Sequence, residues 1–281
     1  MPELPEVEIV KRGLESLIVG KTIKKVDVLW PRIIQTNELI DQWKEKIVNE
    51  KNHAIHRRGK YIVFELTHYY LISHLRMEGK YYYYNKTEIP KQIDKHTHVI
   101  FTYSDMSQLH YHDVRKFGRI ERIDKEELEN YFQKKKLGVE PFSDMFTSEY
   151  LADKLKQTRA SIKSSLLSQH IVTGLGNIYV DETLFKAKIY PLTPSNQLTS
   201  NQIDSLQEAI VKTLYSAVQA GGSTIHTYKN TFGEPGNYQQ ELKVYGKEGD
   251  LCINCGCKII KTKVAQRGTH YCPRCQKLES M

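Results

Sequence analysis

Residues 252–275 read CINCGCKIIKTKVAQRGTHYCPRC, and this stretch decides the fold of the last part of the chain. It holds two Cys-x-x-Cys pairs separated by the sixteen residues 256–271, a spacing typical of a tetrahedral four-thiolate zinc site. The apolar residues and the glycine between the pairs predict two strands and a turn, that is, a zinc β-ribbon. Cys257 breaks the matching spacings and is interpreted as a spectator. The predicted ligands of one structural Zn²⁺ are Cys252, Cys255, Cys272 and Cys275.

The same hairpin is strongly cationic. Arg267 is expected near its tip, followed by a glycine. A solvated basic face is the simple interpretation, but so much charge on a rigid, metal-pinned hairpin favours contact with phosphates. The charged or titratable residues between and beside the cysteines are Lys258, Lys261, Lys263, Arg267 and His270.

Composition agrees with a globular protein that has a polyanionic partner. The chain has 281 residues, 40% hydrophobic and 26% charged, and 41 basic against 33 acidic side chains give a net charge of +8. No apolar run reaches membrane-spanning length, and the N-terminus MPELPEVEIV is acidic where a secretory signal is basic. We therefore expect a cytoplasmic protein, in which five cysteines favour metal binding over disulfides.

The hydrophobic pattern predicts an α+β protein with several domains. A short helix is expected over 5–18, because Val7, Val10, Leu14 and Leu17 recur at helical spacing. Between 22 and 122, short strands without intervening helices favour a sandwich or barrel. Helices follow after a Lys/Gly/Pro-containing linker near 134–141. The predicted strands are 22–29, 60–67, 69–75, 80–84, 98–103 and 108–114, and the later helices are 148–157, 160–170, 178–187 and 201–220.

A glycine turn and the N-terminus carry two further signals. In Thr173-Gly-Leu-Gly-Asn-Ile-Tyr, Asn177 stands where a helix N-cap is expected, and the amides after it would form a phosphate site, although most such turns are only tight connections. Removal of Met1 would expose the secondary amine of Pro2 at the start of a helix, whose field lowers the amine pKa. An uncharged amine there can attack a sugar carbon and form an iminium.

Together these motifs resemble the bacterial formamidopyrimidine-DNA glycosylases, which are 8-oxoguanine glycosylase/lyases. The similarity runs in order along the chain: Pro-Glu-Leu-Pro-Glu-Val-Glu, His56-Arg-Arg-Gly-Lys-Tyr, His74-Leu-Arg-Met-Glu-Gly, His112-Asp-Val-Arg-Lys-Phe-Gly, Leu137-Gly-Val-Glu-Pro, Ile162-Lys, the Asn177 turn, Gly221-Gly-Ser-Thr and the cysteine hairpin. The resemblance implies an N-terminal β-sandwich, a helical domain with a helix–two-turn–helix motif and a C-terminal zinc β-ribbon.

The resemblance also implies roles for the catalytic residues. Pro2 would be the nucleophile, Glu3 the proton donor for base release and sugar opening, and Glu6 a supporting carboxylate, although acids in a first helical turn also occur without any chemistry. Lys60 would lie beside the lesion and assist strand cleavage. Arg267 would bind a phosphate and serve the second elimination. Base loss followed by β- and δ-elimination would cut the strand on both sides of the abasic sugar.

The expected partner is damaged double-stranded DNA. The protein is expected to bind it as a monomer and, through this DNA, to associate with the bacterial nucleoid. Met77, Arg115 and Phe117 match the family residues that fill the gap left by a flipped-out base, whereas core packing would be the interpretation of Met77 and Phe117 taken alone. His74, His96, Arg159, Lys163 and Asn177 would hold the bent backbone. The expected domains are a catalytic domain at 1–133, a linker at 134–149, a helix–two-turn–helix domain with a lesion-covering loop at 150–246 and the zinc ribbon at 247–281.

Two alternatives and two departures complete the prediction. Endonuclease VIII-like glycosylases share the layout but usually begin Pro-Glu-Gly-Pro and lack the Arg-x-Phe pair that Arg115 and Phe117 form here. A non-catalytic zinc-ribbon DNA-binding protein would leave Pro2, Glu3 and Lys60 unexplained.

The loop at 224–240 matches the family only in outline, with Glu234 where a basic residue is common, so the resemblance does not extend to the lesion preference. A retained Met1 would turn the Pro2 nitrogen into an unreactive amide.

Overall fold

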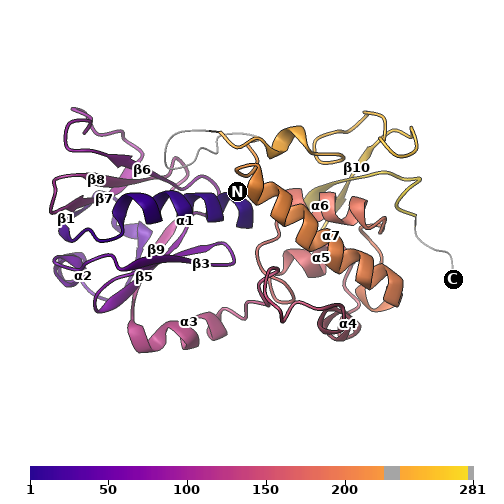
Figure 1. Cartoon of the computed structure of the whole chain (residues 1–281), viewed down its shortest axis with the longest axis horizontal. Helices are drawn as coiled ribbons and strands as arrows, with labels where there is room; N and C mark the ends of the chain where they lie inside the picture. The colour runs from indigo at the N-terminus through magenta and orange to yellow at the C-terminus, as the bar shows by residue number, and fades with distance from the viewer. Residues whose placement is uncertain (225–234, 278–281) are drawn as a thin grey trace. The chain divides into compact units, whose positions relative to one another are not determined.

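The computed structural model describes residues 1–224 and 235–277. The chain divides into two compact units, Met1–Lys134 with Gly221–Asn237 and Lys135–Ala220 with Tyr238–Met281. Figure 1 follows the chain through both units, from indigo at the N-terminus to yellow at the C-terminus. Within the described residues, none of the helices combines the length and the apolarity that crossing a bilayer requires.

The first unit is a β-sandwich, as predicted. One sheet has the antiparallel strand order β1-β7-β8-β6, and the other has the order β2-β9-β5-β4-β3, in which β2 and β9 run parallel. The helix α1 (Leu4–Ile18) precedes the sheets, and α3 (Leu128–Lys134) follows them. The strands are β1 (Ile23–Val28), β2 (Ile34–Gln35), β3 (Ala54–Arg58), β4 (Tyr61–Glu65), β5 (Tyr69–His74), β6 (Lys80–Tyr84), β7 (Thr97–Tyr103), β8 (Gln108–His112) and β9 (Arg119–Asp124).

Alternation along the strands explains the core of this unit. Alternate residues of β7, namely Val99, Phe101 and Tyr103, are buried in the core cluster that the two sheets share. In α1, Val7 and Leu14 enter the same cluster, because apolar residues at helical spacing form one stripe. Figure 1 shows α1 running beside β3. The sandwich core therefore fixes the direction of α1 and the position of its N-terminus.

Four elements of the first unit are not evident from the sequence, namely α2, β3, β9 and the two-residue strand β2. The expected absence of helices between 22 and 122 is wrong, because α2 (Ile40–Ile47) forms there and buries only Trp43 and Ile47, too few residues to give a periodic signal. The strands β3 and β9 are rich in charged residues and show no hydrophobic alternation. Pairing with neighbouring strands, rather than their own pattern, makes them strands.

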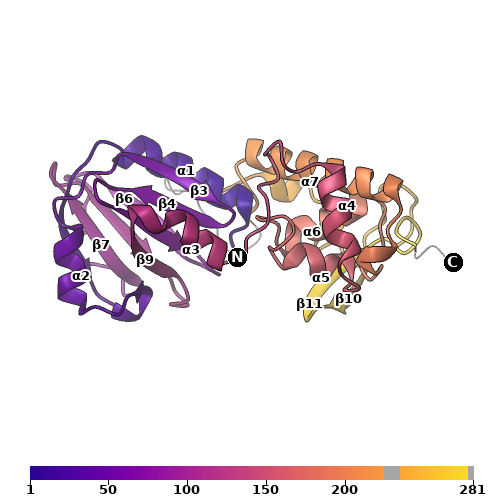
Figure 2. The same ribbon diagram turned by 90° about the horizontal axis from the view of Figure 1, so that it is seen from below.

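The second unit packs helices against the C-terminal hairpin. Thr147 caps the N-terminus of α4, and Thr199 with Gln202 forms a capping box on α7. The longest helix, α7, ends before Gly221 and Gly222, which have positive φ values of 77° and 80°. Figure 2 shows α4–α7 and the hairpin from below. The elements are α4 (Ser148–Lys156), α5 (Ile162–Leu167), α6 (Asn177–Lys186), α7 (Ser200–Gln219), β10 (Ile260–Val264) and β11 (Arg267–Tyr271), with 3₁₀ turns at Ser195–Gln197 and Tyr238–Gln240.

A buried histidine in the first unit gives a pH-dependent stability. His110 lies on β8, where Gln108 Oε1 is 2.8 Å from its Nε2 and the Tyr84 ring lies edge-on at 4.8 Å. Burial lowers the pKa of His110 to about 4. The unfolded chain therefore binds a proton at a higher pH than the folded chain does, and the free energy of unfolding falls as the pH drops from about 6.5 to about 4.

We expect His110→Leu to remove this part of the pH dependence. Urea unfolding followed by fluorescence at several pH values between about 4 and 7 measures it. His53, whose ring is exposed and bonds Thr67, supplies the matched control as His53→Leu, which is expected to keep the wild-type slope. A parallel loss of stability with pH in wild type and His110→Leu would contradict the assignment.

Candidate functional site

The start of α1 brings together the residues predicted for chemistry at the N-terminus. Glu3 is the N-cap of the helix, and its backbone N–H donates to Glu6 Oε2 at 2.8 Å within a capping box. The other oxygen, Glu6 Oε1, accepts from the backbone N–H of Ser223 at 2.7 Å. Both carboxylates are almost fully buried, and Pro2 stands partly buried beside them. Glu6 thus ties the backbone at Glu3 to the 222–224 segment.

Two glycines near this contact, Gly222 and Gly236, have little room for a side chain. A Cβ on Gly222 would lie 3.0 Å from Glu6 Oε1, and its φ of +80° belongs to the left-handed region that favours glycine. A Cβ on Gly236 would lie 2.3 Å from the Gly222 carbonyl oxygen, and the Gly236 N–H donates to Thr224 Oγ1 at 2.8 Å. Thr224, the first residue of the predicted lesion-covering loop at 224–240, and Gly236 further along it therefore lie side by side next to the Gly222 backbone. Residues 225–234 of that loop, with Glu234, lie outside the described residues.

Lys60 lies in the two-residue turn between β3 and β4 and is 6% exposed. The turn is held by Arg57, whose Nη1 donates to the Gly59 carbonyl at 3.0 Å and whose Nε donates to Glu8 Oε2 at 2.8 Å. Burial raises the pKa of Glu8, but the hydrogen bonds and charges of Arg57 and Arg12 outweigh it and hold this pKa below its usual value. A chain of contacts thus runs from α1 through Arg57 to the backbone beside Lys60. Nothing in the sequence predicts this role of Glu8 or Arg57.

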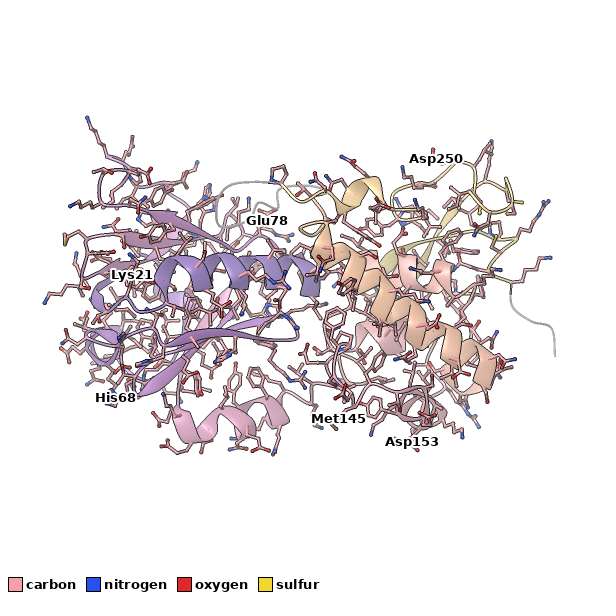
Figure 3. All side chains as sticks on the ribbon, viewed as in Figure 1. Lys21, His68, Glu78, Met145, Asp153 and Asp250 are labelled. Carbon is pink, nitrogen blue, oxygen red and sulfur yellow. The ribbon has the colours of Figure 1, made fainter. Side chains whose placement is uncertain are left out.

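The predicted gap-filling residues lie on two turns of the same unit. Met77 lies in the turn between β5 and β6, next to Glu78, which is labelled in Figure 3. Phe117 is 48% exposed, and the Arg115 guanidinium lies 4.8 Å from the centre of its ring. A core residue would be buried, so the exposed Phe117 is not explained by core packing.

The turn that carries Arg115 and Phe117 is fixed by Asp113. Its buried carboxylate accepts from the backbone N–H groups of Arg115 at 3.0 Å, Phe117 at 2.9 Å and Gly118 at 2.7 Å. A Cβ on Gly118 would lie 1.6 Å from the Tyr111 hydroxyl, so glycine is required there. The only sequence signal is an aspartate followed by a glycine five residues later, a pattern too common in turns to indicate this role.

The two predicted histidines lie in different surroundings. His74 ends β5, is 9% exposed and accepts the Arg76 N–H through Nδ1 at 3.0 Å. Its ring lies edge-on to Tyr61 at 4.6 Å, and Tyr61 directly follows Lys60. His96 is partly exposed, and its ring centre lies 5.7 Å from that of His112.

In the second unit, the glycine turn differs from the prediction by one residue. The N-cap of α6 is Gly176, and Asn177 is the first helical residue, so the expected side-chain cap by Asn177 is wrong. Its Nδ2 instead donates to the Gly268 carbonyl at 2.9 Å. The turn is held by Gln169, which accepts from Gly174 N–H at 2.9 Å and donates to the Leu175 carbonyl at 2.6 Å.

The three cationic residues predicted for this unit separate into two kinds. Arg159 and Arg267 are exposed. Lys163 is fully buried, and its Nζ donates to Asp181 Oδ1 at 2.6 Å and to the Gly268 carbonyl at 3.2 Å. The expectation that Lys163 holds the DNA backbone is at odds with this burial, because its ammonium is directed into the protein.

The cysteine hairpin has the geometry of a zinc site. The four sulfurs of Cys252, Cys255, Cys272 and Cys275 all lie within 4.8 Å of one another. The Sγ–Sγ distances are 3.8 Å for Cys252–Cys275 and 3.4 Å for Cys255–Cys272, close to the ~3.8 Å that tetrahedral Zn–S bonds of about 2.3 Å require. Cys257 is outside this cluster. Its carbonyl oxygen accepts the Cys252 N–H at 2.8 Å, so Cys257 shapes the knuckle through its backbone.

Three segments of the chain match domains of known protein families. Residues 1–120 match the formamidopyrimidine-DNA glycosylase N-terminal domain, residues 137–229 match the formamidopyrimidine-DNA glycosylase H2TH domain, and residues 249–278 match a zinc finger found in FPG and IleRS. The chain belongs to the formamidopyrimidine-DNA glycosylase family. The family's zinc finger and the four-cysteine cluster together identify one structural zinc site, and the predicted spectator role of Cys257 agrees with the cluster.

Relatives within the family cover nearly the whole chain. The formamidopyrimidine-DNA glycosylase of Enterococcus faecalis is 50% identical over 279 residues, which is 99% of this chain and 98% of the relative. That of Bacillus subtilis is 48% identical over 276 residues, 98% of this chain and 99% of the relative. Among solved structures, the Lactococcus lactis Fpg in complex with DNA containing an abasic site has a TM-score of 0.92 and 45% identity, covering 98% of this chain and 100% of that one. A mutant of the same protein with Fapy-dG-containing DNA has a TM-score of 0.93, 45% identity and coverage of 99% and 100%.

Proposed function

We propose that the protein is a bifunctional DNA glycosylase and AP lyase that removes oxidised purines from duplex DNA in base excision repair. The observation that carries this proposal is the start of α1, where the backbone beside Pro2 is fixed by the buried Glu6 carboxylate. A DNA-binding module without catalysis has no need of two buried carboxylates beside a proline at the N-terminus. Membership of the family and its DNA-bound relatives support the same activity.

The proposed chemistry begins with the Pro2 amine, after Met1 has been removed. Its lone pair attacks the anomeric carbon of the damaged nucleotide, the bond to the base breaks, and Glu3 gives a proton to the departing base. The Pro2 nitrogen then returns its proton to the Glu3 carboxylate, which gives it to the ring oxygen as the sugar opens to the iminium. The resulting iminium draws electrons away from the sugar, so that a proton is lost beside it and the 3′ phosphate leaves. Lys60 assists this β-elimination, and Arg267 assists the δ-elimination that releases the 5′ phosphate. Glu6 acts by holding the backbone of Glu3 in place.

The damaged base has to leave the stack before this attack, which costs roughly a few kcal/mol. Phe117 and Met77 fill the gap as apolar wedges, and Arg115 bonds the orphaned partner base. The Asp113 carboxylate supports this role, because it fixes the backbone of the turn before DNA arrives. The phosphates on either side are contacted by His74, His96, Arg159 and Asn177, and the positive net charge favours this binding.

The proposed domains are the catalytic domain at 1–133, the linker at 134–149, the helix–two-turn–helix domain at 150–246 and the zinc ribbon at 247–281. The zinc supplies no chemistry of its own, because four thiolates leave it no open position; it folds the hairpin that carries Arg267. The protein acts as a monomer on chromosomal DNA, and so in association with the nucleoid.

The preference for purines is tested with two duplexes, one with 8-oxoguanine opposite cytosine and one with thymine glycol. Single-turnover excision is expected to be faster on 8-oxoguanine, and each reaction is followed by borohydride trapping of the covalent intermediate. Faster release of thymine glycol would favour the endonuclease VIII-like alternative. Binding to both duplexes without a trapped adduct would favour a non-catalytic DNA-binding protein.

Substitution of Arg57 by methionine is expected to slow strand cleavage, because it frees the backbone beside Lys60. The lost bonds join a charged group to Glu8 and to the Gly59 carbonyl, and such bonds contribute about 1.5–3 kcal/mol each. Because tenfold in rate corresponds to about 1.4 kcal/mol, a loss of at least tenfold is expected. Gel analysis of a cleaved abasic-site duplex measures the rate.

Arg12→Met is the matched control. Arg12 also binds Glu8, at 2.9 Å, but it is half exposed and lies on α1 itself rather than beside the turn at Gly59. We expect nearly wild-type cleavage from this control. Equal rates for Arg57→Met and Arg12→Met would show that the Arg57 contacts do not position Lys60.

A further inference from the structure

The tip of the zinc hairpin is attached to α5 and α6 through one backbone carbonyl. The carbonyl oxygen of Gly268 accepts from Lys163 Nζ at 3.2 Å and from Asn177 Nδ2 at 2.9 Å. Gly268 directly follows Arg267, the residue proposed for δ-elimination. Two donors from the helices therefore hold the backbone one residue after Arg267.

A buried carboxylate aligns this attachment. Asp181, which lies four residues after Asn177 on α6, is fully buried, and its Oδ1 binds Lys163 Nζ at 2.6 Å. Its Oδ2 accepts the backbone N–H of His270 at 2.9 Å and lies 3.4 Å from the His270 ring nitrogen Nδ1. Asp181 thus binds the hairpin strand directly and through Lys163. Both oxygens serve the hairpin, so the carboxylate links α6 to both sides of Thr269.

The other side of Arg267 is fixed by the turn of the hairpin. Ala265 and Gln266 both have positive φ values, 48° and 58°, as the two central residues of a tight two-residue hairpin loop require. Residues other than glycine and asparagine seldom adopt this conformation, so the surrounding structure has to impose it. With the turn before it and the Gly268 carbonyl after it, Arg267 has a fixed backbone while its side chain stays exposed.

We propose that Asp181 and Lys163 are positioning residues for Arg267: they hold the hairpin tip in the orientation that the second elimination requires, and Lys163 does so from inside the protein. This inference rests on the proposed function, because Arg267 takes its role from it. A buried ion pair is weak evidence for stability, since replacing both partners by neutral groups of similar size is often neutral for folding. Loss of the pair should therefore be visible in the geometry of the tip more than in folding.

The test compares the two elimination steps in the full-length, zinc-loaded protein on a duplex with one abasic site. In Asp181→Asn, the δ-elimination product is expected to form about ten- to a hundredfold more slowly, as for a catalytic group displaced by about 1 Å. Formation of the borohydride-trapped adduct and of the β-elimination product is expected to stay close to wild type. A general loss of stability would slow all three together, whereas loss of positioning changes their ratio.

Two further variants keep the result decisive. Lys163→Met/Asp181→Asn leaves no buried charge without its partner, and it replaces the single variant if that one fails to bind zinc. Glu208→Gln is the matched control, because it breaks an exposed ion pair with Lys212 on α7 of the same unit and is expected to leave both eliminations unchanged. Amide hydrogen exchange at His270, whose N–H is bonded to Asp181, is expected to accelerate in both test variants.

A wild-type ratio of δ- to β-product in a zinc-loaded variant would overturn the inference. Failure of the proposed function gives a different result, because the wild-type protein itself would then form no trapped adduct and no cleavage product. Faster exchange at His270 with an unchanged product ratio would also count against the inference, since the contact would then hold the hairpin without serving Arg267.

Discussion

Pro2→Gly is expected to abolish the borohydride-trapped adduct and to lower strand cleavage by about three orders of magnitude or more, as loss of a nucleophile does in other covalent enzymes. Glycine keeps an N-terminal amine but replaces the secondary amine by a primary one and removes the ring that fixes φ at the start of α1. The Glu3–Glu6 capping box and the Ser223 contact do not involve the proline ring, so the fold should be retained. Gel analysis of trapped adducts, with mass spectrometry of the N-terminus, measures the effect.

The control for this experiment is the same chain with Met1 retained. The Pro2 nitrogen is then a tertiary amide, and we expect no adduct although DNA binding persists. Pro5→Ala alters a second proline in the first turn of α1, leaves the N-terminal amine intact and should trap at nearly the wild-type rate. An adduct of normal yield in Pro2→Gly, or in protein with Met1 retained, would assign the nucleophile to another residue.

Removal of zinc is expected to cost DNA binding and strand cleavage together. In small zinc domains the free energy of metal binding, about 10–16 kcal/mol at neutral pH, is largely free energy of folding. The hairpin has few apolar contacts of its own, and its core consists of Cys252, Cys272, Ile259, Val244 and Phe185, so without the metal β10 and β11 should lose their structure. Chelation followed by fluorescence anisotropy on an abasic-site duplex, with zinc determined by atomic absorption, tests this expectation.

The cysteines supply a matched pair of variants. Cys255→Ser removes a ligand and should reproduce the effect of chelation, whereas Cys257→Ser should retain zinc and activity, because Cys257 lies outside the sulfur cluster and its carbonyl oxygen serves the knuckle. Arg267→Ala separates the metal from the proposed chemistry: it should retain zinc but lose δ-elimination. Normal cleavage by a zinc-loaded Arg267→Ala would refute the role given to the hairpin.

The features that the sequence predicts best depend on residues that lie close together in the sequence. The two Cys-x-x-Cys pairs predict the zinc cluster with its ligands, because four thiolates at these spacings suit one tetrahedral ion. The stripe of Val7, Val10 and Leu14 predicts α1 for a similar reason. Each signal is local, so it can be recognised without knowledge of the tertiary contacts.

The features that the sequence does not predict depend on partners far along the chain. Lys163 is predicted as a DNA contact because no acidic residue near it in the sequence suggests an ion pair. In the structure its ammonium is buried in an ion pair with Asp181, 18 residues later. The contact from Glu6 to Ser223 spans 217 residues and follows only from the fold.

The hydrogen bond between Thr224 and Gly236 has a consequence for engineering this protein. Because the Gly236 N–H bonds Thr224 Oγ1 and its backbone lies against Gly222, the two ends of the intervening sequence are already brought together. The entropy of closing a loop grows only slowly with its length, by about 0.6 kcal/mol for each doubling. We therefore expect that the sequence between these two residues can be replaced by segments of other lengths while the contact between Glu6 and Ser223 is kept.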